Sequence, residues 1–140
     1  MEFTDKQIQI LNTAIKIISK HGIQGLTIRK LASSIGVSEP AIYRHFKNKK
    51  EIINSIITYL SSKHQNILEK ARKGHSTSIE QLQAIFLNTI DMFEKSPELT
   101  SVIFAEEIFQ DDKFVKGRIL EIMEDTYKEI ASIIRKGQRN

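Results

Sequence analysis

The 140-residue sequence contains no cysteine and only two prolines. The absence of cysteine excludes disulfides and thiolate metal sites, and it agrees with a reducing compartment. No apolar run approaches the roughly 18 residues that would span a membrane. The first residues, MEFTDKQIQI, lack the apolar segment of a signal peptide. We therefore expect a cytoplasmic protein that does not enter a membrane.

Motifs that carry common enzymatic chemistry are also missing. The sequence has no glycine-rich phosphate loop and no nucleophile elbow. Its histidines, His21, His45, His64 and His75, include no pair at the i, i+4 spacing of a zinc site on a helix. We predict no enzymatic activity, no metal site and no cofactor.

Positive charge is concentrated near the N-terminus. Residues 1–50 contain nine lysines and arginines against three acids, a net charge of +6, whereas residues 51–140 carry a net charge of −2. A basic first third on a slightly acidic remainder indicates that one end meets a polyanion, although many basic faces are only solvated.

Helical signals cover the whole chain. Apolar residues recur at helical spacing, and no alternation of period two is sustained. Capping residues and glycines divide this pattern into seven predicted helices, at about residues 4–22, 27–35, 38–46, 48–74, 78–95, 97–109 and 111–136. We predict an all-α fold. A three-helix helix-turn-helix head (residues 1–47) is joined by a long fourth helix to a helical, apolar-cored body (residues 48–140).

The expected helix starts depend on particular side chains. Gln7 follows Thr4 at the spacing of a capping box, and Glu51 stands where it can return a capping bond to Asn48. The predicted N-caps are Thr4, Thr27, Ser38 and Asn48.

The second and third predicted helices have the proportions of a helix-turn-helix, with Gly36 in the turn. A short second helix enters the major groove only if its N-terminal residues are small or polar and its buried face anchors it. Ile42 and Phe46 are four residues apart and are expected to face inward, with Val37 closing the turn. Pro40 presets the first helical turn. The residues left facing outward are Ser38, Glu39, Ala41, Tyr43 and Arg44.

Several polar residues in this region are suited to DNA. Helix N-termini favour anions, and flat side chains with polar tips can bond to phosphate oxygens. The residues suited to phosphate are Thr27, Tyr43, His45, Lys49 and Lys50. Arg29 and Arg44 are long enough to reach a guanine edge.

From Leu26 to Ile52 the sequence reads LTIRKLASSIGVSEPAIYRHFKNKKEI. This segment resembles the N-terminal region of the TetR family of bacterial transcriptional regulators. The matching features are a Thr-opened helix with Leu-Ala, then Gly-Val-Ser, a Tyr, a following aromatic pair, and Lys-Glu at the next helix start. The resemblance covers about the first third of the chain.

The resemblance implies a division of roles among the site residues. It implies phosphate contacts from Thr27, Ser38, Tyr43, His45 and Lys49. It implies base or groove contacts from Arg29, Glu39, Pro40, Ala41 and Arg44. One departure is Lys50, which stands before Glu51 where the family pattern often has the acid directly, so either lysine can fill the phosphate-binding position.

For the body, the resemblance implies an effector pocket. Its expected lining is Ile57, Leu60, His64, Phe86, Ile90, Phe93, Phe104 and Tyr127. The alternative is that these residues are simply core. Glu106 and Glu107 either place a carboxylate near a cationic effector or lie on a solvated helix face. Family members usually continue with two further long helices that pack in the dimer, which this chain, ending in IIRKGQRN, is expected to lack.

Together these features predict a TetR-like, ligand-responsive repressor. It would bind double-stranded DNA as a homodimer on a near-palindromic operator and respond to a small apolar effector. One alternative is a DNA-binding nucleoid or cell-cycle scaffold whose body binds a protein partner. Another is a helical interaction module without DNA function.

Overall fold

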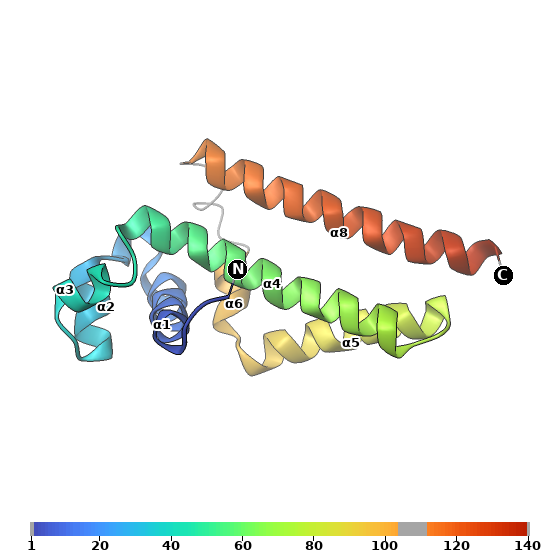
Figure 1. Cartoon of the computed structure of the whole chain (residues 1–140), viewed down its shortest axis with the longest axis horizontal. Coiled ribbons are helices and arrows are strands. Elements are labelled where there is room, and N and C mark those ends of the chain that lie inside the picture. The colour runs from blue at the N-terminus through green and yellow to red at the C-terminus, as the bar shows by residue number, and fades with distance from the viewer. Residues whose placement is uncertain (1, 104–111, 140) are drawn as a thin grey trace.

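The computed structural model describes residues 2–103 and 112–139, and these residues form the all-α fold predicted from the sequence (Figure 1). The elements are α1 (Asp5–His21), the 3-10 helix η1 (Ile23–Gly25), α2 (Ile28–Ile35), α3 (Glu39–Tyr43), α4 (Lys49–Gly74), α5 (Ser78–Lys95), α6 (Glu98–Ile103) and α8 (Lys113–Arg139). In Figure 1 the long helix α4 (green) crosses the molecule, with α2 and α3 at one end and α8 alongside. Among the described helices, none is long and apolar enough to cross a membrane.

Local capping bonds set the helix starts largely as predicted. Thr4 and Gln7 form the reciprocal capping box, with Thr4 N–H donating to Gln7 Oε1 at 3.0 Å. The side chains of Thr27, Ser38 and Asn48 cap α2, α3 and α4. The prediction that Glu51 returns a capping bond to Asn48 is wrong. Glu51 Oε2 instead accepts from the N–H of Lys47, the residue before Asn48, at 3.3 Å.

Helix ends differ more from the predictions than helix starts do. The helix α3 ends at Tyr43 rather than near Phe46, because the chain tightens into a turn in which His45 N–H donates to Ile42 O at 2.9 Å. The last helix continues to Arg139, beyond the expected end near 136. The sixth predicted helix is described as far as Ile103, and residues 104–109 of that prediction lie outside the described residues.

The main apolar core lies where α1, α2 and α3 meet the first half of α4. Its most deeply buried large side chains are Ile10, Leu11, Ile15, Leu26, Leu31, Ile42 and Ile52. Leu99 and Val102 of α6 and Val115 of α8 belong to the same cluster. The core therefore includes side chains from both sides of residue 47, and α6 packs against α1.

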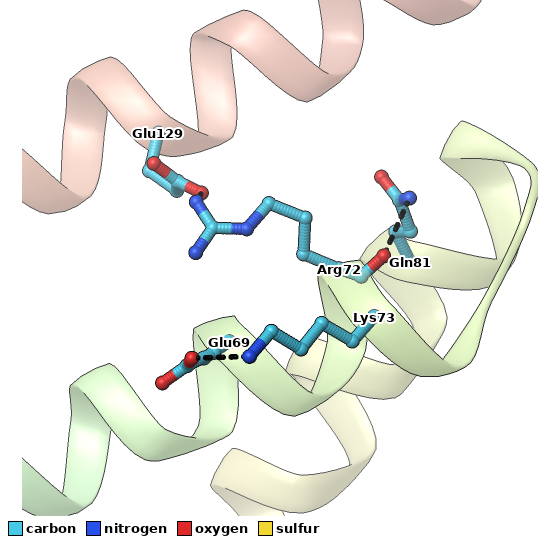
Figure 2. Close-up of polar contacts among 5 residues, drawn as sticks. All are labelled: Glu69, Arg72, Lys73, Gln81 and Glu129. Carbon is cyan, nitrogen blue, oxygen red and sulfur yellow. Dashed lines mark hydrogen bonds and ion pairs between the residues drawn. The ribbon is translucent and has the colours of Figure 1, made fainter.

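The far end of α4 is held by a second, smaller apolar cluster and by polar contacts. The cluster consists of Leu68, Ala71, Ala84, Ile85 and Ile133. Figure 2 shows Arg72 of α4 reaching Glu129 of α8, with 2.6 Å between Nη1 and Oε1. Gln81 of α5 donates to the carbonyls of Arg72 and His75 at 3.4 and 2.9 Å. These contacts fix both α5 and α8 on the end of α4 that lies away from α3 (Figure 1).

Candidate nucleic-acid interface

The turn between α2 and α3 is shaped by Gly36. This residue has φ of 85°, in the left-handed region that side chains with a Cβ disfavour. Its N–H donates to Ala32 O at 2.9 Å, and Val37 N–H donates to the same carbonyl at 3.0 Å. The turn therefore ends α2 and redirects the chain into α3, in the helix-turn-helix arrangement predicted from the sequence.

The helix α3 is anchored on one side and open on the other. Ile42 and Phe46 are only 1% and 2% exposed and pack in the main core, while Val37 is half-buried against it. Tyr43 is 50% exposed. The other exposed residues of this segment are Ser38, Glu39, Pro40 and Arg44, and Ala41 is half-buried. The predicted inward residues are thus confirmed, and the predicted outward residues are accessible to a partner apart from the half-buried Ala41.

The start of α2 adds a second group of polar residues at the same end of the molecule (Figure 1). Thr27 Oγ1 accepts from Lys30 N–H at 3.0 Å, which leaves its side chain at the helix N-terminus. Thr27, Arg29 and Lys30 are all exposed. Cationic side chains and a helix N-terminus next to α3 make this end electrostatically suited to an anionic backbone.

The two lysines at the start of α4 have different surroundings, although the sequence could not separate them. Lys49 is half-buried, and its Nζ donates to Ile23 O at 2.7 Å. Lys50 is exposed, with its Nζ 3.6 Å from Oδ2 of Asp112. Lys49 therefore ties α4 to η1, whereas Lys50 projects from the surface beside Asp112, the residue before α8.

Three residues make contacts with the head or with α4 that the sequence analysis did not predict. Gln7 Nε2 donates to His45 O at 3.4 Å and so supports the half-buried turn after α3. Asp112 lies beside Lys50. Arg118 of α8 donates to Asn54 O of α4 at 2.9 Å. These contacts join residues far apart in sequence, and only the capping role of Gln7 has a local signal.

The residues of the predicted effector pocket do not come together around one described cavity. Ile57 is buried in the main core, and Leu60 and Phe93 are half-buried against it. Phe86 and Tyr127 are 67% and 72% exposed, and Ile90 is also exposed. Phe104, Glu106 and Glu107 lie outside the described residues. The pocket stays a prediction.

His64 lies between the two apolar clusters along α4, after Leu60 and before Leu68. The side chain is half-buried, and burial lowers the pKa of its imidazole because the charged form loses hydration. His64 is therefore mostly neutral in the folded protein at pH 7.

The comparisons with known proteins agree with this architecture. Residues 10–56 match the model described as "Bacterial regulatory proteins, tetR family". The nucleoid occlusion factor SlmA of Salmonella dublin is 30% identical over 125 residues, which are 87% of this chain and 62% of that protein. SlmA of Actinobacillus pleuropneumoniae serotype 5b is 24% identical over 94% of this chain, which spans 65% of that relative's length.

Solved structures share the fold over almost the whole chain. The fatty acid degradation regulator FadR of Bacillus halodurans superposes with a TM-score of 0.81 at 20% identity, covering 99% of this chain and 72% of that one. FadR of Bacillus subtilis, solved in complex with stearoyl-CoA, gives 0.75 at 23% identity, covering 94% and 70%. The matched segment contains α2, α3 and the start of α4, which form the surface described above. Residues 10–56 are therefore similar to the TetR family of bacterial regulatory proteins, and the solved structures share the fold of the chain beyond that segment.

Proposed function

We propose that this protein is a transcriptional repressor whose head, residues 1–47, binds operator DNA, and whose body, residues 48–140, controls that binding. The observation that carries the proposal is the two-sided character of α3. Ile42 and Phe46 fix the helix to the core, and the opposite side exposes Ser38, Glu39, Pro40, Tyr43 and Arg44. A short helix anchored in this way fits the major groove of DNA.

The polar residues around α3 divide into two proposed roles. Contacts to phosphate supply salt-dependent affinity, and contacts to base edges supply specificity. The proposed phosphate contacts are Thr27, Ser38, Tyr43, His45 and Lys50, with Lys49 holding the start of α4 in place. The proposed base and groove contacts are Arg29, Glu39, Pro40, Ala41 and Arg44. The exposure of Arg29 and Arg44 supports this division.

The protein is proposed to act as a homodimer. Four exposed apolar side chains follow one another along α8 at spacings of three, four and seven residues: Leu120, Met123, Tyr127 and Ile134. We name this stripe the α8 seam. Val115 and Ile133, which are buried, lie on a neighbouring face of the helix against the rest of the chain. An exposed heptad-like stripe supports helix pairing with a second copy.

An apolar effector is proposed to bind the body and shift α4. Two features support this part. The apolar clusters along α4 are separate, with half-buried His64 between them. The structurally similar FadR of Bacillus subtilis was solved with stearoyl-CoA. With stearoyl-CoA as the probe, we expect a higher melting temperature and weaker operator binding, because an effector must favour the arrangement that does not bind DNA.

Selection of bound duplexes from a random DNA library, at a stated near-physiological salt concentration, tests the proposal. We expect enrichment of a two-fold symmetric site whose half-sites lie about one helical turn apart. Enrichment of a single half-site would contradict the dimer and leave the head as a DNA reader. Weak binding without enrichment, lost as salt rises, would contradict a sequence-specific repressor.

A second candidate function is favoured by the similarity to SlmA, whose name describes a nucleoid occlusion factor. In that case the same head binds DNA, but the body takes a protein partner. The two functions differ in what changes DNA affinity. A scaffold keeps its affinity when apolar ligands are added and retains a specific protein on immobilised operator DNA.

A further inference from the structure

We propose that Asp112 competes with the DNA backbone for Lys50, so that the position of α8 against α4 tunes the affinity of the head for DNA. This inference rests on the proposed DNA-binding function. It assigns a role to Asp112, which follows Lys50 by 62 residues in sequence but contacts its ammonium group.

The two carboxylate oxygens of Asp112 have different contacts. Oδ1 accepts from the N–H groups of Phe114 and Val115, at 2.9 and 3.3 Å, and so caps the start of α8. Oδ2 lies 3.6 Å from Lys50 Nζ. The capping bonds hold the carboxylate at the helix start, and the second oxygen is left to face the lysine.

The carboxylate of Asp112 is charged at neutral pH. Partial burial acts to raise its pKa, but the N–H groups of Val115 and Phe114 and the ammonium of Lys50 together lower it below its usual range. A fixed negative charge therefore lies beside a cation that is proposed to meet phosphate. It both occupies Lys50 and repels the phosphate that would replace it.

Arg118 keeps Asp112 in register with Lys50. Its Nη1 donates to Asn54 O at 2.9 Å, and its Nη2 donates to Thr58 Oγ1 at 2.7 Å. Lys50, Asn54 and Thr58 are spaced by four residues, so they lie on one face of α4. An effector-driven sliding or tilting of α8 that breaks the Arg118 contacts would also move Asp112 relative to Lys50.

The ion pair is weak enough to be displaced by DNA. The side chain of Lys50 is 67% exposed, against 29% for Asp112, and exposed pairs are screened by water and salt. Lys50 can therefore leave Asp112 when a phosphate approaches. The expected consequence is a graded change in affinity of about two- to fivefold.

Asp112→Asn isolates the charge of Asp112, because asparagine caps a helix about as well as aspartate. We expect this variant to bind a fixed operator duplex about two- to fivefold more tightly than wild type at low salt. The matched control is Asp125→Asn, which makes the same charge change at an exposed position further along α8. The control is expected to bind like wild type.

A double-mutant cycle with Lys50→Met shows whether the effect passes through Lys50. We expect Asp112→Asn to give a smaller gain in affinity when Lys50 is already methionine, because only the direct repulsion of phosphate by the carboxylate is then removed. Equal gains in both backgrounds, or no gain over wild type, would overturn this inference alone. Absence of DNA binding by folded wild-type protein would overturn the proposed function and this inference with it.

Discussion

Lys49 and Lys50 are adjacent in sequence, but their ammonium groups have different contacts, and this difference gives the first prediction. Lys49→Met removes the only hydrogen bond found for that ammonium among the described residues, to Ile23 O, and should lower the free energy of unfolding by about 1 kcal/mol. Lys50→Met should change stability by less than about 0.5 kcal/mol, because its partner is a surface ion pair. Urea denaturation followed by circular dichroism measures both values.

The same two variants should differ in DNA binding. Lys50→Met should weaken binding to all duplexes and lower the slope of log affinity against log salt by about 0.9, the value for one lost phosphate contact. Lys49→Met should keep the wild-type slope. Fluorescence anisotropy across a salt series measures both slopes, and a reduced slope for Lys49→Met alone would reverse the assignment.

His64 should make stability depend on pH in a defined direction. Burial lowers its pKa from the ordinary value of 6.5, so below that pH the unfolded chain binds more protons than the folded one. The free energy of unfolding is therefore highest above about pH 6.5 as far as His64 is concerned. It decreases as the pH falls toward the lowered pKa of His64 in the folded protein. Substituting glutamine, which does not titrate, should reduce this loss.

Urea midpoints of wild type and His64→Gln at pH 7.5 and 5.5 check the prediction. The difference between the midpoints at pH 7.5 and pH 5.5 should be smaller in His64→Gln than in wild type. The contributions of the other titrating groups cancel in this comparison, because both proteins contain them. Asn66→Gln, at an exposed position of α4, serves as the control and should keep the wild-type difference. A variant with the full wild-type difference would exclude His64 as its source.

Among the elements, the turn between α2 and α3 depends on a single backbone conformation. Gly36 has φ of 85°, and a Cβ at this position would meet no atom within 4 Å. The cost of Gly36→Ala is therefore conformational rather than steric, and we expect a loss of about 1 kcal/mol in the free energy of unfolding. Thermal or urea denaturation measures it.

Gly36→Asn separates that conformational cost from a general effect of adding a side chain. Asparagine enters the left-handed region more readily than alanine. We expect the asparagine variant to be more stable than the alanine variant, despite its larger side chain. The reverse order would show that space, not backbone conformation, requires glycine at this turn.

Local signals explain which elements could be predicted from the sequence. The capping residues Thr4, Thr27 and Ser38 act within three residues of their own positions, so each helix start can be inferred from nearby letters. Gly36 likewise marks the turn by itself. The fold class and the exposed side of α3 follow from such signals, combined with the helical spacing of Ile42 and Phe46.

The remainder depends on contacts between distant segments. Arg118 and Asn54 are 64 residues apart, and Arg72 and Glu129 are 57 apart, so no local pattern indicates either pair. On α5, Ile85 is buried while the adjacent Phe86 is exposed. Both are apolar, and helical periodicity alone does not decide which of two neighbouring apolar residues faces the core.

At the scale of the whole molecule, α8 has two apolar faces, one buried and one exposed. One packs on α4 and α5, through residues such as Val115 and Ile133, and the other is the α8 seam. A helix shared by the body and a dimer interface would transmit a shift of one copy to the other. Because Asp112 caps the start of α8, the proposed dimer interface and the surroundings of Lys50 would depend on the same element.

The proposed dimer is tested by placing a charge in the α8 seam. Met123 is 59% exposed and central in the stripe, so Met123→Glu should leave the monomer folded and disrupt pairing, because a buried unpaired carboxylate is costly. Sedimentation velocity at micromolar concentration should give a dimer for wild type and a monomer for the variant. Ser132→Glu, exposed elsewhere on α8, should remain dimeric. Met123→Glu should still bind a half-site. If Met123→Glu sediments as a dimer, the interface lies elsewhere on the molecule.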